Sequence, residues 1–202
     1  MKVKVCGITT QEAADTACKS GVDMLGFVFA ESSRRIDPEA AKAIVDQLPA
    51  RVSAVGVFVN ETVETIEHIA RTVGLDVVQL HGDESPALCK QLSYPVIKAF
   101  TIREKGDVLR LAAYDCDYYL VDSPGMKYRG GSGNTFDWSL LQGENLQREK
   151  LILAGGLNQN NVKDACKQVK PAAVDVSSGV ETNGKKDTKK IIDFIQTAKS
   201  ID

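Results

Sequence analysis

The chain has 202 residues, of which 43% are hydrophobic and 26% are charged, and its formal net charge is −2. This length fits one globular domain, and the composition excludes a disordered, collagen-like or coiled-coil chain. The charge lacks the basic excess of a nucleic-acid binder, and no apolar run is long enough for a transmembrane helix or a signal peptide. We therefore expect no nucleic-acid or membrane partner. The five cysteines are scattered and odd in number, which predicts free thiols in a reducing cytoplasm.

Eight short apolar runs, rich in Val, Leu, Ile, Phe or Ala, follow one another along the chain. They begin near Val3, Met24, Ser53, Val77, Pro95, Tyr118, Leu151 and Ala173. Segments with helical periodicity lie between most of them. Strands that alternate with helices form βαβ units with a parallel sheet. Eight such units predict an α/β fold, a single (β/α)8 barrel of eight parallel strands over residues 1–202.

The helical segments have recognisable start signals. Apolar residues recur at helical spacing in 62–73. Asp37–Pro38 and Ser85–Pro86 each place an N-cap residue before a proline at a first helical position, and 104–114 and 188–199 also have helical patterns. A doubly wound open sheet is the alternative fold, but it usually has fewer strands and a phosphate fingerprint after its first strand.

Polar groups and glycines gather where the strands are expected to end, the side on which such barrels bind ligands. They are Cys6, Gly7, Ser32, Ser33, Arg34, Arg35, Asn60, Gln79, His81, Gly82, Asp83, Thr101, Asp122, Asp175 and Ser177. The glycine-rich segment 123–134 is expected to be a mobile loop. The opposite strand ends carry ordinary turns. This asymmetry indicates a site, although tight turns alone also favour Gly and Ser.

Two neighbouring loops are the strongest single feature. Gly155-Gly156 follows the seventh strand and Ser178-Gly179 follows the eighth. Backbone N–H groups of both loops, with a short helix N-terminus, would form the phosphate cradle that is usual in such barrels. The alternative is that they are only turn glycines.

Single residues at the strand ends have two interpretations each. Cys6 is either a chemical group or a packed thiol, and Asp122 either faces the barrel mouth or caps a turn. His81 could contact a ligand. Arg34 and Arg35 are either solvated charges or, for one of them, a bidentate partner of a substrate carboxylate. No Cys or His cluster has the spacing of a zinc site.

Eight ordered blocks of sequence cover the whole chain. They are residues 4–9, 26–29 with 32–36, 55–60, 78–84, 122 with 130–133 and 136–138, 153–157, 175–181 and 184–187. Together they resemble the phosphoribosylanthranilate isomerase family of tryptophan biosynthesis. Ser132 stands where the family usually has threonine, a change that keeps the hydroxyl group.

The resemblance implies an Amadori rearrangement of N-(5-phosphoribosyl)anthranilate to 1-(2-carboxyphenylamino)-1-deoxyribulose 5-phosphate. It implies Asp122 as the acid that protonates the ring oxygen and Cys6 as the base that removes the C2 proton. No metal, nucleotide or redox cofactor is needed. The expected substrate-binding residues are Arg35 for the anthranilate carboxylate, together with His81, Gly155, Gly156, Asp175, Ser178 and Gly179.

Both chemical roles impose physical conditions. Asp122 must keep its proton near neutral pH, so we expect burial to raise its pKa. Cys6 must ionise, so we expect a positive group beside it, and Arg35 or a helix N-terminus is the candidate.

Two other functions remain open. One is a different barrel enzyme, either a sugar-phosphate epimerase or an indole-forming synthase or lyase. An epimerase would favour metal-binding His and Asp on several strands, and only His81 is available; the Lys and Glu set of a synthase is not found. The other is a phosphosugar-binding or regulatory module, which leaves Cys6 and Asp122 without a role. We expect a monomer, because no exposed apolar stripe stands out.

Overall fold

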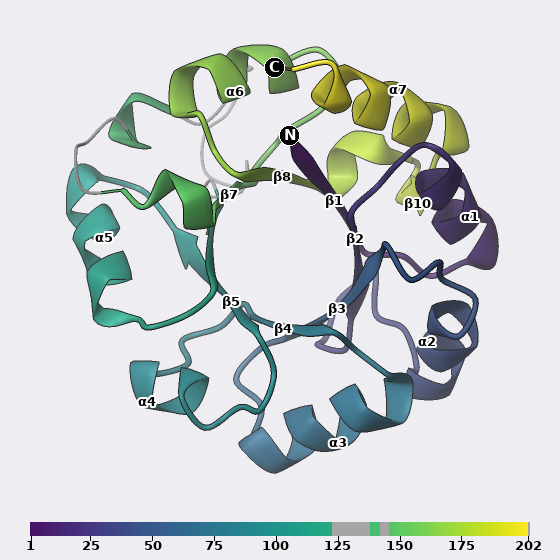
Figure 1. Cartoon of the computed structure of the whole chain (residues 1–202), viewed down its shortest axis with the longest axis horizontal. Helices are drawn as coiled ribbons and strands as arrows, with labels where there is room; N and C mark the ends of the chain where they lie inside the picture. The colour runs from purple at the N-terminus through teal and green to yellow at the C-terminus, as the bar shows by residue number, and fades with distance from the viewer. Residues whose placement is uncertain (123–137, 142–145, 202) are drawn as a thin grey trace.

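Eight parallel strands close into a barrel in the part of the chain that the computed structural model describes, residues 1–122, 138–141 and 146–201 (Figure 1). The strands are β1 (Lys2–Cys6), β2 (Met24–Val28), β3 (Ser53–Phe58), β4 (Val77–Leu80), β5 (Val96–Thr101), β6 (Tyr118–Asp122), β7 (Leu151–Leu153) and β8 (Ala173–Val176). Each pairs with the next, and β8 pairs with β1. The predicted barrel is confirmed, every strand begins within one residue of its expected start, and the open sheet is excluded.

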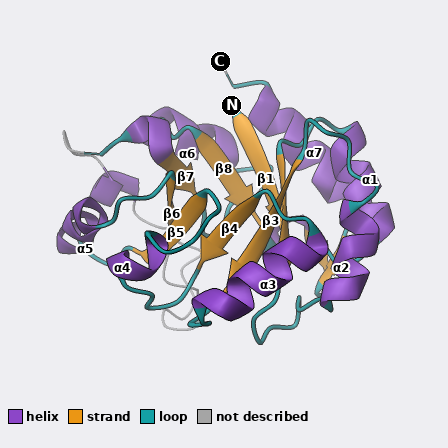
Figure 2. Cartoon of the chain, turned by 60° about the horizontal axis from the view of Figure 1, so that its bottom comes forward, coloured by secondary structure: helices purple, strands orange, loops and turns teal. Residues whose placement is uncertain are grey.

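Helices surround the barrel on its outside (Figures 1 and 2). They are α1 (Gln11–Lys19), α2 (Pro38–Val45), α3 (Val63–Val73), α4 (Pro86–Cys89), α5 (Lys105–Leu109), α6 (Val162–Val169) and α7 (Thr188–Lys199). The expected caps are confirmed, since the side chains of Asp37 and Ser85 accept from the backbone N–H groups of Glu39 and Leu88. None of the described helices is long and apolar enough to cross a bilayer.

Residues 104–114 do not form the single helix that the pattern predicts. The α-helix α5 ends at Leu109 and continues as the 3-10 turn η1 (Arg110–Ala113). Gly106 lowers the helix propensity of this short segment, and tighter i→i+3 turns are common at helix ends. Further short elements are η3 (Trp138–Leu141), η4 (Arg148–Lys150), η5 (Ser178–Val180) and the hairpin of β9 (Glu181–Thr182) and β10 (Lys185–Lys186).

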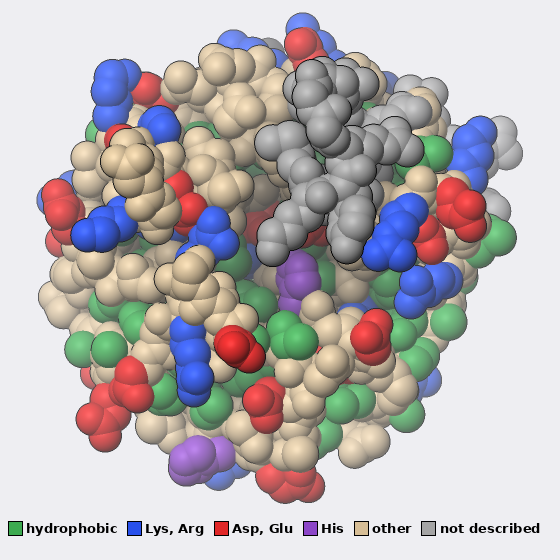
Figure 3. Space-filling view, turned by 180° about the vertical axis from the view of Figure 1, so that it is seen from behind, with side chains coloured by type: hydrophobic (Ala, Val, Ile, Leu, Met, Phe, Trp, Pro, Cys, Tyr) green, Lys and Arg blue, Asp and Glu red, His purple; other side chains and the backbone are tan. Residues whose placement is uncertain are grey.

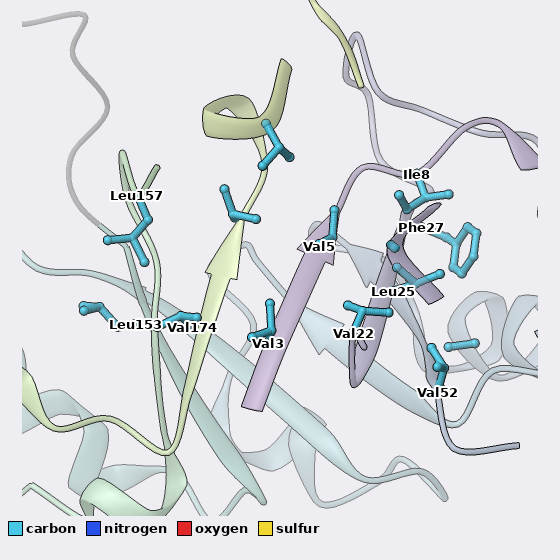
Figure 4. Packing of buried hydrophobic residues seen from close by; sticks show 14 of the residues in the cluster. Val3, Val5, Ile8, Val22, Leu25, Phe27, Val52, Leu153, Leu157 and Val174 are labelled. Carbon is cyan, nitrogen blue, oxygen red and sulfur yellow. The ribbon is translucent and has the colours of Figure 1, made fainter. Parts of the chain in front are cut away.

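The two faces of each strand belong to different layers. Val3 and Val5 of β1 and Val174 of β8 pack outward in the layer between strands and helices, as Figure 4 shows. Side chains alternate along a strand, so Lys4 and Cys6 point into the barrel. A second, smaller apolar cluster of alternate residues from the other strands fills the barrel interior. The ends of β1, β4, β6 and β8 thus turn polar side chains toward one mouth.

Candidate active site

Cys6 is the last residue of β1 and is buried, with 8% of its surface exposed. Gly26 on β2 makes room for it, because a Cβ at residue 26 would lie 2.7 Å from the Cys6 sulfur. Gly7 then turns the chain away with φ of +80°, a conformation that favours glycine. Burial raises the pKa of the Cys6 thiol, and the charge of Lys4 acts in the opposite direction.

Buried ion pairs surround this thiol. Lys4 Nζ lies 2.9 Å from Asp175 Oδ1, with side chains 0% and 9% exposed. In a second pair, Glu181 accepts from Lys186 Nζ at 2.7 Å. Lys186 Nζ also donates to the Ser177 carbonyl oxygen at 3.0 Å. Lysines from β1 and β10 are therefore among the cations that act on the thiol, and the sequence analysis did not single them out. The contribution expected of Arg35 or a helix N-terminus stays a prediction.

The two adjacent arginines have different surroundings. Arg34 Nε and Nη2 donate to the two carboxylate oxygens of Glu181, each at 2.7 Å. The Arg34 side chain packs against Gly7, where a Cβ would lie 2.6 Å from its Cδ. Arg35 is exposed, and its side chain makes no hydrogen bond or ion pair with the described residues. Arg34, rather than Arg35, thus lies beside the thiol.

Asp122 and His81 approach each other across the mouth. Asp122 Oδ2 lies 3.8 Å from His81 Nε2, and each side chain is about one-third exposed. His81 Nδ1 lies 2.9 Å from Gln79 Nε2. Burial lowers the pKa of His81, and the charge of Lys4 lowers it further. A neutral ring that accepts from the Gln79 amide would carry its proton on Nε2, the nitrogen toward Asp122. Figure 3 shows one end of the barrel, with a histidine near the centre among acidic and basic side chains.

The loops after β7 and β8 lie against each other. Gly179 contacts the carbonyl group of Leu157 so closely that no Cβ fits. Gly155 and Gly156 have φ of +86° and +64°, and the space where a Gly156 side chain would stand is open. Within the described residues, the N–H groups of Gly156, Ser178 and Gly179 donate to no backbone or side-chain acceptor. Such free backbone donors are suited to an anion.

Several of these residues were not expected from the sequence. Lys4, Lys186 and Glu181 complete the charge arrangement around Cys6, and Gln79 orients His81. A lysine between two outward-facing valines in an apolar strand was the available signal for Lys4. The glycine-rich segment 123–134, including Ser132, lies outside the described residues. No metal-binding group of three or more His, Cys, Asp or Glu is present in the described ranges.

The closed barrel, with a thiol and a carboxyl group at one mouth, defines a (β/α)8-barrel protein with a candidate active site at the carboxyl ends of its strands. The family model for N-(5'-phosphoribosyl)anthranilate (PRA) isomerase matches residues 3–197. The chain therefore belongs to the N-(5'-phosphoribosyl)anthranilate isomerase family.

Individual relatives match over the whole chain. N-(5'-phosphoribosyl)anthranilate isomerase from Bacillus mycoides (strain KBAB4) is 54% identical over 200 residues, 98% of each chain. A crystal structure of phosphoribosylanthranilate isomerase with reduced 1-(o-carboxyphenylamino)-1-deoxyribulose 5-phosphate is 42% identical, covers 100% of both chains and has a TM-score of 0.86. A structure of monomers of the dimeric Thermotoga maritima enzyme is also 42% identical, with the same coverage and a TM-score of 0.87.

Proposed function

We propose that this protein converts N-(5'-phosphoribosyl)anthranilate to 1-(2-carboxyphenylamino)-1-deoxyribulose 5-phosphate in tryptophan biosynthesis. Family membership supports this substrate. The observation that carries the chemistry is the placement of a thiol and a carboxyl group at one mouth. Cys6 ends β1 and Asp122 ends β6, and these strands are not neighbours in the barrel. The two groups can therefore approach a sugar ring from different sides.

The proposed reaction needs one acid and one base. Asp122 donates a proton to the ring oxygen, the C1–O bond breaks and the furanose opens to a Schiff base. The Cys6 thiolate then takes the proton from C2, and the electron pair of that C–H bond moves toward the iminium nitrogen. The resulting enolamine tautomerises to the ketone. Because the oxidation of C2 is balanced by the reduction of C1 in the same molecule, the proposed reaction requires no external redox cofactor, and its steps use no metal or nucleotide.

The remaining residues bind the two anionic ends of the substrate. We assign the phosphate to the N–H groups of Gly156, Ser178 and Gly179, which have no acceptor among the described residues. Gly155 supports this loop through its left-handed conformation.

For the anthranilate carboxylate the structure favours Arg34, because it lies beside the thiol and uses only one edge of its guanidinium for Glu181. Arg35, the contact that the sequence predicts, is the alternative. Two other expected contacts also stay predictions. The first is His81, which lies at the mouth beside Asp122. The second is Asp175, of which one carboxylate oxygen already accepts a hydrogen bond from Lys4, so that the other oxygen would contact the substrate.

The function is tested by adding the purified protein to phosphoribosylanthranilate and following the loss of anthranilate-type fluorescence. We expect turnover by the wild type and none above background by the double variant Cys6→Ser/Asp122→Asn. Circular dichroism of both proteins establishes that they are folded. A folded wild type that leaves the fluorescence unchanged would exclude the proposed activity and favour a phosphosugar-binding module.

We also propose that the protein works as a monomer in the cytoplasm. All five cysteines are free thiols, as is usual in a reducing compartment. Among the described residues, the large exposed hydrophobic side chains are Val59 and Leu109, too few for the apolar interface of an obligate dimer. Light scattering should give a mass near 21.9 kDa. Twice that mass would show a dimer, the state named for the Thermotoga maritima relative.

A further inference from the structure

Lys4 is a fully buried lysine inside the barrel. Its neighbours Val3 and Val5 occupy the outer layer (Figure 4), so its side chain points inward, where Nζ meets Asp175 at 2.9 Å. Removing two charges from water costs about as much as their attraction returns, and apolar side chains in place of a buried ion pair are often as stable. Packing and stability therefore do not explain a lysine at this position.

Cys6 follows Lys4 by two residues on the same strand, so both side chains lie on the same face. Two residues of a strand span about 6–7 Å, a distance that the extended lysine side chain bridges. Burial raises the pKa of the Cys6 thiol, and Lys4 is the strongest influence in the opposite direction. Burial would lower the pKa of Lys4, yet Asp175 and Cys6 together raise it above its ordinary value. The 2.9 Å contact with the Asp175 carboxylate favours the charged form of Lys4.

Among the described residues, the charged side chains that interact with the thiol or with its neighbours carry one excess positive charge. The charged side chains that face it from β1, β8, the β2–α2 loop and the β9–β10 hairpin are Lys4, Asp175, Arg34, Lys186 and Glu181. Three are cations and two are anions. His81, whose pKa is lowered by burial, interacts with Lys4 and Asp175 of this set. A thiolate at Cys6 balances the charge of this group, whose two lysines are buried and whose Arg34 is partly exposed.

We propose that Lys4 is the counter-ion of the Cys6 thiolate and acts as a positioning residue for the base of the reaction. Its catalytic meaning rests on the proposed function, but its effect on the thiol is a property of the free protein. Lys4 lies deeper in the barrel than Cys6 and acts on the substrate only through the sulfur. Asp175 holds the ammonium group in place and, as an anion, opposes ionisation of the same thiol.

The proposal is tested by measuring thiolate absorbance in the ultraviolet as a function of pH, in the full chain without substrate. Cys6→Ser serves as the blank for the other four cysteines and the tyrosines. Lys4→Met removes the charge but keeps the length of the side chain. We expect the pH at which the Cys6 thiolate forms to move upward by about one unit or more. Lys4→Arg keeps the charge and should retain most of the thiolate.

Asp175→Asn is the matched control, because it breaks the same ion pair from the other side. It removes an anion and leaves the Lys4 charge, so we expect the thiolate fraction to rise. A loosened barrel would move both variants in the same direction. Shifts in the same direction, or an unchanged thiol in Lys4→Met, overturn the proposal. If circular dichroism shows Lys4→Met to be unfolded, Asp175→Asn decides alone: a rise supports the proposal and no rise overturns it.

Turnover provides a second readout. The acidic limb of the kcat/KM pH profile should move to higher pH in Lys4→Met and return toward the wild-type position in Lys4→Arg. The two proposals fail separately. Opposite thiolate shifts in a protein without isomerase activity would leave Lys4 as the counter-ion and remove the proposed function. An active wild type together with an unchanged thiol in folded Lys4→Met would support the proposed function and overturn the role of Lys4 as counter-ion.

Discussion

The carbonyl group of Leu157 occupies the space in which a side chain on residue 179 would begin. A Cβ at Gly179 would collide with the carbonyl oxygen and lie 3.2 Å from the Asn158 Cα. The loops after β7 and β8 therefore meet backbone to backbone, which brings the free N–H groups of both loops to one place.

Gly179→Ala should destabilise the protein by about 1–3 kcal/mol, because the backbone must move to admit the methyl group. Gly106→Ala is the matched control. A Cβ at residue 106 meets nothing closer than 3.6 Å, and alanine favours the helix by about 0.5–1 kcal/mol. Chemical denaturation measures both changes. Equal stability of the two variants would mean that the loops separate without cost.

Replacement of Gly156 by valine should raise KM more than it lowers kcat. A β-branched residue does not fit the left-handed conformation of residue 156, so the loop and its N–H groups move. The phosphate is held alike in the ground and transition states, and loss of such uniform binding appears mainly in KM. Steady-state kinetics measures both constants. In a second measurement, inorganic phosphate should inhibit the wild type competitively and the Gly156→Val variant only weakly. An unchanged KM would place the phosphate elsewhere.

Cys6→Ser and Asp122→Asn should each lower kcat by about 10²–10⁴-fold, the usual contribution of a positioned acid or base. KM and the melting temperature should change little. The wild-type kcat/KM profile should be bell-shaped, because one group must be ionised and the other protonated. Asp122→Asn should lose the alkaline limb. Near-normal kcat in both variants would make these residues structural.

Arg34→Ala should raise KM about tenfold or more, since a hydrogen-bonded charge pair is worth about 1.5–3 kcal/mol. Arg34→Lys should recover only part of the binding, because the planar fork is lost. Arg35→Ala is the control and should bind substrate almost normally. A larger effect at Arg35 than at Arg34 would support the contact expected from the sequence and leave Arg34 as a brace for Glu181.

His81 should make stability depend on pH. Burial lowers its pKa from 6.5, so the unfolded chain binds the proton more readily than the folded protein. The unfolding free energy contributed by neutral His81 is present above about pH 6.5 and decreases as the pH falls below it. His81→Gln should reduce this acid dependence of the melting temperature. His68, which lies on the outer helix α3, provides the control, and an equal effect of His68→Gln would contradict the assignment.

The sequence predicted the strands well because each is a buried apolar run between polar turns, and the positions of Cys6, Asp122 and the two glycine loops follow from strand order alone. The partners of Cys6 were not predictable in this way. Lys4 meets Asp175 only because β8 closes on β1 in the register Lys4↔Asp175. Glu181 joins Arg34 to Lys186 through a short hairpin. Such contacts depend on register and side-chain direction, which apolar periodicity does not encode.

The junction between the first and last elements has a practical consequence. Lys199 near the end of α7 pairs with Asp23 at 2.6 Å, and Asp23 also accepts from the Val3 N–H. The chain ends therefore lie close together, as Figure 1 shows, at the end of the barrel where β1 begins and Cys6 does not lie. Tethering to a surface or a carrier through either terminus would leave the opposite end of the barrel, where Cys6 lies, open to solvent. A short linker between the two termini would also allow a circular permutant whose new termini lie in an outer loop.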